Sequence, residues 1–495
     1  LAIFAMVFGS TFGTLNSANA ATVDIGDGLT VTAADKDGAG GGVLLAADSY
    51  TFSGATGIFD TTTAITIVDL DSITANTALS ITGAGGLTIN DLDATDAMAI
   101  TIADTSSLTV GGAATAAEPL SIALTGTAAV TFSGDQTHDA IITATDDGDG
   151  TVTFSGATDY DAAIGATADD VGTLTITGAS SIDAASFIKT VNVGANTDFT
   201  ADINANVIDI TGATTTATFG DKFLAASGAS SVATMNATGQ KIILDGADVI
   251  SGDLTAATDG FGEVEVNLDN ASNGMTGNIG TSTSAKVGLL DINKDFKTTG
   301  NVFVDATTID DAEVLTLAGV TKTVTGTIDG DGAVEGNIVV NSGGDATKIF
   351  TFTGNIGATS ELKLLTLTTE ATFEGSVKVD NIDLAAATTA VFKSDLTIGA
   401  NDLTLGDATS TATFSGTSTQ TITGGAGGED ILGTGVVQIS NTSNGGVVFG
   451  SNAHLATNTL QLKLAANANL KNSVTGHILK DITTLAGSSI ILDDT

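Results

Sequence analysis

Cysteine, arginine and tryptophan are absent from this chain of 495 residues, and proline occurs once, as Pro119. Without cysteine the chain can form no disulfide, no thiolate metal site and no cysteine nucleophile. The formal net charge is -42, from 57 acidic residues and 15 basic residues that are all lysine. Phosphate binding depends on clustered lysine and arginine, so nucleic acid is an unfavourable partner. With proline so scarce, turns must be built from the 61 glycines together with asparagine and aspartate.

Large side chains are also scarce. Hydrophobic residues make up 42% of the chain but aromatic residues only 4%, so isoleucine, valine, leucine, alanine and threonine must form the interior. These small and β-branched residues suit a thin, regularly stacked sheet better than a thick globular core. A chain of this length exceeds one compact core, which leaves several domains or an elongated repeat array. The composition favours the array.

The first twenty residues form a secretory signal pattern. An apolar run from Leu1 to Leu15 is followed by Ala18, Asn19 and Ala20, a small-x-small pattern that places cleavage after Ala20. The initiator methionine and the positive segment are missing, so we expect residues 1–20 to be a signal peptide truncated at its start. A transmembrane helix is the alternative, but the run is short and broken by glycine. No later segment is long and apolar enough to span a bilayer. We therefore expect an exported bacterial protein, secreted or held at the cell surface.

A repeat of about 22 residues runs through the chain. Five short alternating strands end in equivalent apolar residues that are 21, 22, 22 and 22 positions apart: Ile89, Val110, Phe132, Phe154 and Ile176. The pattern returns with spacings of 21, 19 and 22 at Phe352, Phe373, Phe392 and Phe414. Strands this short cannot bury an apolar face alone, so each unit must stack on its neighbours.

Further apolar pairs between the repeated positions indicate about three strands per coil. The predicted fold is therefore all-β, a right-handed parallel β-helix (β-solenoid) with coils of about 19–22 residues. We expect residues 21–495 to form one elongated array without a convincing helix. Between 181 and 348 the period is less regular, which loop insertions in ordinary coils explain.

Acidic turns are the candidates for specific chemistry. Carboxylates cluster beside glycine at Asp146, Asp147 and Asp149, and again at Asp329 and Asp331. Hard oxygen ligands at this spacing predict Ca²⁺ as the possible cofactor. The first cluster does not complete an EF-hand loop, because Thr158 occupies the twelfth place, where a bidentate glutamate is required. The alternatives are an ordinary Asp-Gly turn and diffuse association with cations.

One further segment has a calcium-binding pattern. Residues 424–432 read GGAGGEDIL and differ at one position from the calcium-binding nonapeptide of repeats-in-toxin proteins. Glu429 stands where that family has aspartate, and Asp430 follows it. We include both as candidate ligands. The pattern occurs once, whereas those sites form between consecutive repeats, so a glycine-rich corner is the alternative.

The residues that catalysis requires are few. The histidines His138, His454 and His477 are scattered, and none has metal-ligand spacing to another. Polysaccharide-degrading enzymes that share the β-helix use a basic catalytic residue, often arginine, and aromatic platforms for sugar. Here there is no arginine, and the only tyrosines are Tyr50 and Tyr160. We therefore expect a protein that is not an enzyme, with a β-helical polysaccharide-degrading enzyme as a minor alternative.

Two later coils suggest a family. Ala-Thr-Phe-Glu-Gly at 371–375 and Ala-Thr-Phe-Ser-Gly at 412–416 resemble the passenger repeats of autotransporter adhesins and surface-layer-like outer-membrane proteins. The resemblance implies a structural or adhesive rod on the outer membrane that binds host or neighbouring cell surfaces. It also implies a C-terminal β-barrel anchor, which we expect to be absent from this fragment. The alternative is a surface-layer-like lattice, in which the partners are copies of the chain and calcium bridges acidic turns.

Overall fold

We describe the protein from a computed structural model. It describes residues 22–492, except for 26–28, 33–48, 53–55, 73–76, 95, 113, 117–119, 225–230, 247–249, 268–273, 282–283, 343–347, 426–430, 451–452, 454, 456–460, 473–480 and 485–488. The predicted signal peptide, 1–20, lies outside the described residues. In the part of the chain that is described, every regular element is a β-strand, and none of it is a helix that could cross a membrane.

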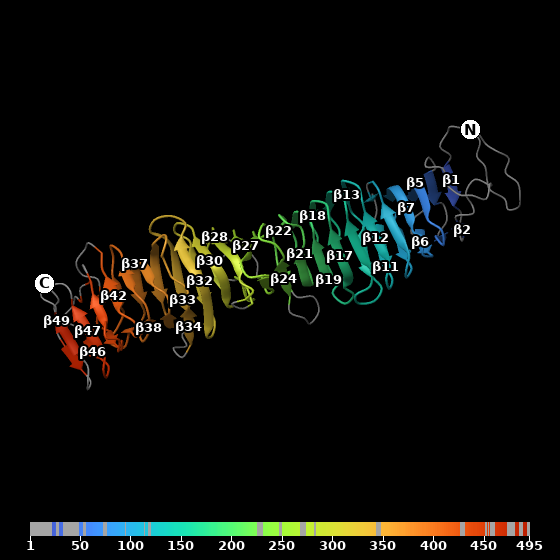
Figure 1. The fold of residues 1–495 in the computed structure, drawn as a ribbon. Coiled ribbons are helices and arrows are strands. Elements are labelled where there is room, and N and C mark those ends of the chain that lie inside the picture. Colours follow the sequence, from blue (N-terminus) through green and yellow to red (C-terminus); the bar gives the residue numbers. More distant parts are fainter. Residues whose placement is uncertain are drawn as a thin grey trace, which may run out of the picture. The chain divides into compact units, whose positions relative to one another are not determined.

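The strands pair in parallel and stack coil upon coil, which confirms the predicted β-solenoid (Figure 1). The chain divides into two compact units. Unit 1 comprises Leu1–Ala217 and Leu224–Ser231, and unit 2 comprises Thr218–Phe223 and Val232–Thr495. The strands β22 (Thr216–Phe219) and β23 (Phe223–Leu224) contain residues of both.

Unit 1 is built of three ladders of parallel strands, each receiving a strand or half a strand from successive coils. The first ladder contains β2 (Leu29–Thr32), β4 (Thr56–Asp60), β6 (Thr77–Thr82), β8 (Met98–Ile102), β11 (Leu120–Leu124) and β14 (Ile141–Ala144). The second contains β5 (Ile65–Ser72), β7 (Leu87–Ala94), β9 (Ser107–Val110), β12 (Ala129–Phe132), β15 (Thr151–Phe154), β17 (Val171–Ile176), β19 (Ser186–Val193) and β21 (Ile203–Ile210).

The third ladder of unit 1 is formed by shorter strands and by the second halves of β5 and β7. It contains β1 (Thr22–Ile25), β3 (Ser49–Phe52), β10 (Ala114–Ala116), β13 (Gln136–His138), β16 (Thr158–Tyr160), β18 (Ser180–Ile182) and β20 (Thr197–Phe199). The three ladders face one another across a thin apolar interior. That geometry explains why the sequence needs so few aromatic residues.

The sequence repeat of unit 1 corresponds to one column of this interior. Ile89 pairs in register with Val110, Val110 with Phe132, Phe132 with Phe154, and Phe154 with Ile176. All five side chains are fully buried. The prediction that these positions are equivalent is confirmed.

Unit 2 uses the same construction with more irregular coils. Its first group of strands is β24 (Val232–Met235), β25 (Lys241–Leu244), β26 (Asp253–Ala256), β27 (Phe261–Val266), β28 (Val287–Ile292), β30 (Val302–Ile309), β32 (Lys322–Gly330), β34 (Ile349–Phe352), β36 (Glu370–Phe373), β38 (Thr389–Phe392), β41 (Thr411–Phe414), β44 (Val436–Ile439), β46 (Gln461–Leu464) and β48 (Asp481–Thr484).

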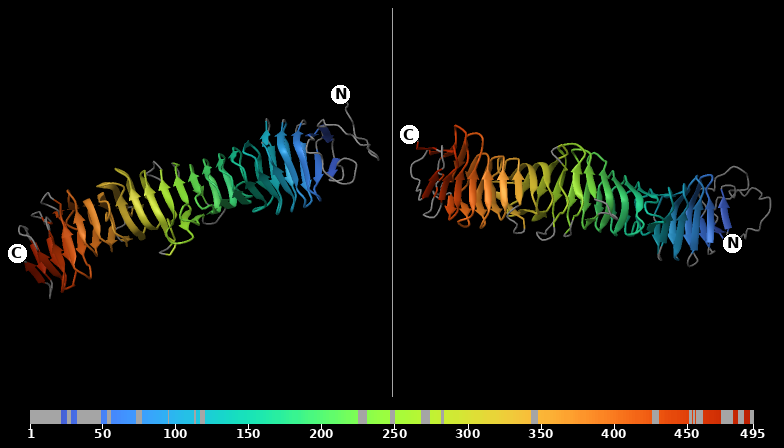
Figure 2. Two further views of the ribbon diagram at one scale, coloured as in Figure 1. Left: turned by 45° about the horizontal axis from the view of Figure 1, so that its top comes forward. Right: turned by 90° about the horizontal axis from the view of Figure 1, so that it is seen from below.

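A second sheet of unit 2 has 12 strands. They are β29 (Phe296–Thr298), β31 (Val314–Ala318), β33 (Glu335–Asn341), β35 (Leu362–Leu367), β37 (Val377–Leu384), β39 (Leu396–Ile398), β40 (Leu403–Leu405), β42 (Gln420–Thr423), β43 (Ile431–Gly433), β45 (Val447–Phe449), β47 (Asn469–Asn472) and β49 (Ser489–Leu492). Within each unit the successive strands lie side by side in both views of Figure 2.

The four phenylalanines of the second repeat also form one column. Phe352 pairs with Phe373, Phe373 with Phe392, and Phe392 with Phe414, and the rings stack with centroids 4.9, 5.2 and 5.5 Å apart. Stacked rings on adjacent coils add specific attraction to the burial of their surface. This column is therefore a rigid part of the interior of unit 2.

Coil length varies more than the sequence predicts. In unit 1 the column that contains Ile176 continues to Val193 and Ile210, in two steps that are each shorter than any step of the predicted repeat. In unit 2 the column that contains Phe414 continues to Ile439 and Leu464, in two steps that are each longer. In these shorter coils of unit 1, β19 and β21 each run through the first and the second ladder without an intervening turn. The predicted coil length therefore holds for the common coil, but some coils are shorter and others are longer.

Glycines at the corners are required by the close approach of coils. Gly134, Gly156 and Gly178 follow β12, β15 and β17, each one coil after the last. A Cβ atom on Gly156 would collide with the carbonyl oxygen of Gly134, and one on Gly178 with that of Gly156. The sequence pattern of a strand followed by a small residue and glycine therefore reports tight stacking of successive corners.

Candidate functional site

The predicted calcium ligands near residue 147 lie in the turn between β14 and β15. One carboxylate oxygen of Asp149 accepts hydrogen bonds from the Thr145 hydroxyl, at 2.9 Å, and from the Asp146 amide, at 3.2 Å. The backbone of Gly126 and the Thr145 hydroxyl lower the pKa of Asp149 below its usual range. The Asp147 carboxylate lies 3.0 Å from Nζ of Lys189. In this geometry Asp149 stabilises the turn and Asp147 forms an ion pair.

The second predicted pair, Asp329 and Asp331, lies at the end of β32. Asp329 Oδ1 accepts hydrogen bonds from the backbone amides of Thr359, at 2.8 Å, and Ser360, at 3.2 Å, which belong to the next coil. Asp331 contributes a repulsive charge that helps to raise the pKa of Asp310, although desolvation is the largest cause of that shift. Asp329 therefore bridges two coils. The third predicted pair, Glu429 and Asp430, lies outside the described residues.

Asp329 illustrates a device that recurs at the corners of both units. A corner carboxylate accepts a hydrogen bond from a backbone amide that lies about one coil along the chain. The pairs are Asp104 with Thr127 at 2.8 Å, Asp135 with Ala157 at 2.7 Å, Asp295 with Val314 at 2.9 Å and Asp395 with Thr421 at 2.7 Å. Hydrogen bonds to an ionised acceptor are stronger than neutral ones. At these corners an acidic side chain therefore joins one coil to the next.

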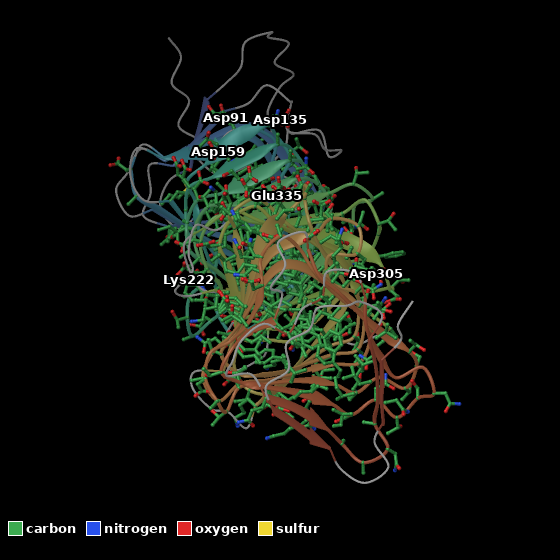
Figure 3. The ribbon with its side chains drawn as sticks, turned by 90° about the vertical axis from the view of Figure 1, so that its left-hand side faces the viewer. Asp91, Asp135, Asp159, Lys222, Asp305 and Glu335 are labelled. Atoms are coloured by element: carbon green, nitrogen blue, oxygen red, sulfur yellow. The ribbon has the colours of Figure 1, made fainter. Side chains whose placement is uncertain are left out.

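Two clusters of three carboxylates have the spacing needed to share a cation, within the described residues. The first comprises Asp159 in β16, Asp161 directly after β16 and Asp183 directly after β18, all in unit 1. All three side chains are exposed, and Asp159 is labelled in Figure 3. Desolvation and then the nearby charge of Asp159 raise the pKa of Asp161.

The Asp183 carboxylate has the opposite surroundings. It accepts hydrogen bonds from the hydroxyls of Ser181 and Thr200, and these bonds lower its pKa. Asp161 and Asp183 are separated by one common coil in the sequence, so the sequence period could have revealed this cluster.

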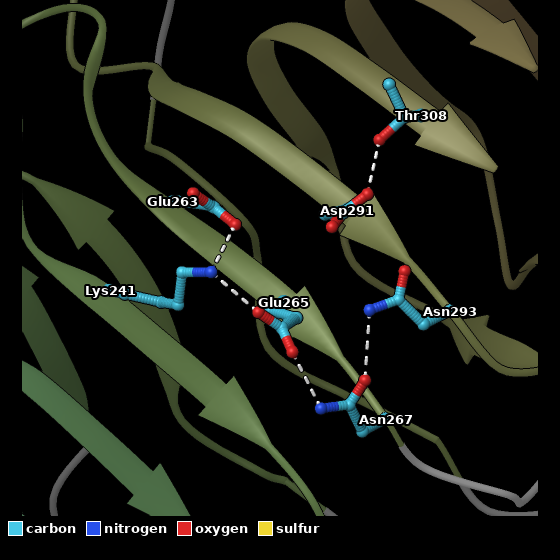
Figure 4. A network of polar contacts seen from close by, with 7 residues as sticks. All are labelled: Lys241, Glu263, Glu265, Asn267, Asp291, Asn293 and Thr308. Atoms are coloured by element: carbon cyan, nitrogen blue, oxygen red, sulfur yellow. Dashed lines mark hydrogen bonds and ion pairs between the residues drawn. The ribbon is translucent and has the colours of Figure 1, made fainter. Parts of the chain in front are cut away.

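The second cluster comprises Glu263 and Glu265 on β27 and Asp291 on β28. Nζ of Lys241 lies 2.8 Å from a carboxylate oxygen of Glu263 and 2.6 Å from one of Glu265 (Figure 4). Desolvation alone would lower the pKa of Lys241, but the two glutamates outweigh it and raise the pKa. Lys241 thus supplies the positive charge that balances Glu263 and Glu265.

Polar side chains extend this network across three coils. Asn267 donates a hydrogen bond to Glu265 at 2.8 Å and accepts one from Asn293 at 3.1 Å, and Thr308 donates one to Asp291 (Figure 4). Sequence spacing did not reveal the cluster, because Glu265 and Asp291 are farther apart along the chain than one common coil. Glu265 and Asp291 come together only because their strands pair in register.

Two titratable side chains of the interior of unit 1, His138 and Tyr160, pack against phenylalanine rings. His138 is fully buried, with its ring centroid 4.5 Å from that of Phe132. Burial lowers the pKa of His138 to about 4 and raises that of Tyr160, whose hydroxyl donates a hydrogen bond to the Ala140 carbonyl. Both side chains belong to the core of unit 1. His454 and His477 lie outside the described residues.

No protein-family model, curated protein or solved structure matches the chain. The fold and the arrangement of side chains are therefore the basis for a proposal about function.

Proposed function

We propose that the chain is a non-catalytic structural and adhesive protein of the bacterial cell surface, of the kind found in autotransporter passengers. The carboxylates that bridge coils are the observation that carries this proposal. They use the most abundant charged group to stiffen an array of coils, which is what a scaffold requires. A β-solenoid of this kind presents long side faces on which binding residues can be placed.

The corner carboxylates also suit an exported protein. Asp135 and Asp329 each accept amide hydrogen bonds across coils while the net charge of -42 keeps the surface strongly solvated. Exposed carboxylates such as Asp91 and Asp135 in unit 1 and Asp305 in unit 2 are labelled in Figure 3. Mutual repulsion of such surfaces opposes non-specific aggregation outside the cell.

Two experiments test location and adhesion separately. Intact bacteria that express the chain are treated with a protease, and we expect the chain to be cleaved while a cytoplasmic marker remains whole. Beads coated with the purified chain are expected to retain more bacterial or host cells than albumin-coated beads. Protection from the protease would contradict the surface location, and equal retention by both kinds of bead would contradict adhesion.

The alternative is a surface-layer-like lattice that calcium stabilises. The exposed cluster of Asp159, Asp161 and Asp183 favours it, because carboxylates that repel one another are the groups that a shared divalent cation would relieve. Washing intact cells with a calcium chelator is expected to release the chain if a lattice exists. Retention of the chain after the wash would remove this alternative while leaving the adhesin proposal untouched.

A further inference from the structure

One outward face of unit 1 consists of hydroxyl side chains in register. Along the second ladder, Thr66 pairs with Thr88, Thr88 with Thr109, Thr109 with Thr131, Thr131 with Thr153, and Thr153 with Thr175. A neighbouring column, two residues earlier on each strand, contains Ser107, Ala129, Thr151 and Thr173. We call the hydroxyl residues of these two columns the threonine face: Thr66, Thr88, Ser107, Thr109, Thr131, Thr151, Thr153, Thr173 and Thr175.

The hydroxyls of the threonine face are available to an external partner. Each side chain is exposed or half-buried. Within the described residues, these hydroxyls make no hydrogen bond to the rest of the chain. The next column along the strands differs, since the hydroxyls of Ser133, Ser155 and Thr177 donate to carbonyl oxygens of the preceding coil, at 3.2 to 3.3 Å. The two outward columns therefore keep their hydrogen-bonding capacity.

Neither of the two columns contains a charged residue, although the chain has a net charge of -42. The column ends where the next coils place Asn192 and then Asp209 in register with Thr175. An outward column of unit 2 has a different composition, with Ile243, Glu265, Asp291, Thr308 and Asp329 in register. The high strand propensity of threonine applies in both units, so it does not by itself explain why successive coils of this face all lack charge.

The hydroxyls lie on a regular grid. Neighbouring parallel strands are about 4.8 Å apart and alternate residues of a strand about 6.6 Å apart. Behind the grid, Phe132 and Phe154 are fully buried with ring centroids 5.8 Å apart, so the interior holds the strands in place. A rigid grid favours a partner that is itself periodic, since all contacts then form together without a loss of conformational entropy.

A second copy of the chain is the less favourable occupant. Six coils of this width cover on the order of 300 Å², against the roughly 800 Å² per partner that a stable protein interface buries. Acidic surfaces around the face would also repel each other. A neutral crystalline solid has neither difficulty, because it repeats its contacts and carries no charge.

We propose that the threonine face binds ice. The exposed planes of hexagonal ice repeat their oxygen atoms at intervals close to both spacings of the grid. Threonine offers a hydroxyl that can bond to lattice water and a methyl group that fills the space between lattice positions. Ice binding by this face would be a function additional to the surface role proposed above.

The test uses the purified full chain and ice grown slowly from its solution. We expect the chain to be enriched in the ice fraction, whereas serum albumin is excluded. Thr153→Lys places a charge in the centre of the face, where the ice surface cannot solvate it, and should lower retention about tenfold or more. Thr153→Val keeps the shape of the side chain, removes the hydroxyl and should cause a smaller loss.

The matched control is Thr413→Lys in unit 2. Thr413 is half-buried and precedes a buried phenylalanine in β41, as Thr153 does in β15, but its in-register neighbours are Val391 and Gln438. Retention of this variant should equal that of the unaltered chain, with the same circular dichroism for all variants. The proposal is overturned if the unaltered chain is excluded like albumin, or if Thr413→Lys loses as much retention as Thr153→Lys.

Two further results would contradict ice binding, and each would assign the threonine face to a different partner. Self-association that Thr153→Lys abolishes, without retention in ice, would assign the face to a second copy of the chain. Retention on crystalline cellulose but not in ice would assign it to a polysaccharide. The ice assay uses purified protein, so exclusion from ice would not contradict the proposed surface role. Likewise, absence of the chain from the cell surface would not contradict retention in ice.

Discussion

The rings of Phe373 and Phe392 stack with centroids 5.2 Å apart and planes 14° from parallel, although the two residues belong to successive coils. Phe352 and Phe414 extend the same stack on either side. Each contact joins one coil to the next through the interior. The four coils from Phe352 to Phe414 are therefore joined by a continuous column of rings as well as by strand pairing.

Removal of the Phe373 ring interrupts that column. Phe373→Ala should lower the free energy of unfolding of unit 2 by about 3–5 kcal/mol, because a buried cavity replaces a side chain that packs on both neighbours. Far-UV circular dichroism during denaturation measures this, since the chain lacks tryptophan. Thr372→Ala, one residue earlier and facing outward, is the control and should change the stability by less than about 0.5 kcal/mol. Equal effects of both variants would contradict the axial role of the ring column.

These columns are the part of the fold that the sequence could predict. Phe132 and Phe154 recur at the coil period, and burial of both rings requires that their strands pair in register. The shorter coils that end at Val193 and Ile210 were not predictable, because a strand such as β19 passes through two ladders without the glycine corner that marks a turn elsewhere.

The candidate site was less predictable than the fold. Asp146 and Asp149 are near each other in sequence, and their turn uses Asp149 for local hydrogen bonds. Glu265 and Asp291 meet only through strand register, and Lys241 reaches Glu265 from the preceding coil. In the sequence, carboxylates that would bind a metal ion look the same as carboxylates that pair with a lysine. Only the position of the lysine in the structure distinguishes the two.

Asp329 and Asp331 allow the two interpretations of an acidic turn to be compared. Asp329→Ala removes the acceptor for the amides of Thr359 and Ser360 and should lower the free energy of unfolding by about 1–2 kcal/mol. Asp331→Ala removes a charge that repels its neighbours and should be neutral. Thermal unfolding with and without a calcium chelator measures both variants. If calcium stabilises the unaltered chain and Asp331→Ala abolishes that effect, the predicted calcium site is correct and the turn interpretation fails.

His138 makes the stability of unit 1 depend on pH. Its pKa is about 4 in the folded chain, against about 6.5 for unperturbed histidine. Between these values the unfolded chain binds a proton that the folded chain does not, so stability is lost as the pH falls. The loss attributable to His138 should be about 2 kcal/mol between about pH 7.5 and about pH 5.

The matched variant for this effect is His138→Leu, which cannot titrate. The aspartates titrate in both proteins, so the difference between their unfolding free energies isolates the histidine. As the pH falls, the unaltered chain should lose more unfolding free energy than His138→Leu does. A difference that stays constant across the range would show that His138 is protonated in the folded chain or remains as basic as in the unfolded chain.

Lys241 holds two glutamates that would otherwise repel each other. Its Nζ lies 2.8 Å from Glu263 and 2.6 Å from Glu265, and these side chains are only 28% and 18% exposed. Lys241→Met should lower the free energy of unfolding by about 1–2 kcal/mol, because it leaves partly buried carboxylates without their cation. Lys363→Met is the control, since the Lys363 pair with Asp311 spans 3.8 Å and is well exposed, and it should cost less than about 0.5 kcal/mol.

The same variant tests whether the second carboxylate cluster can hold a metal ion. Without the lysine, Glu263, Glu265 and Asp291 present oxygens within 4.8 Å of one another, a spacing that Ca²⁺ can bridge. Calcium chloride should therefore restore much of the stability that Lys241→Met loses and should leave the unaltered protein unchanged. Sodium chloride at equal ionic strength separates binding from screening. If the variant is as stable as the unaltered chain, or if both salts restore it equally, the three carboxylates do not bind calcium in place of the lysine.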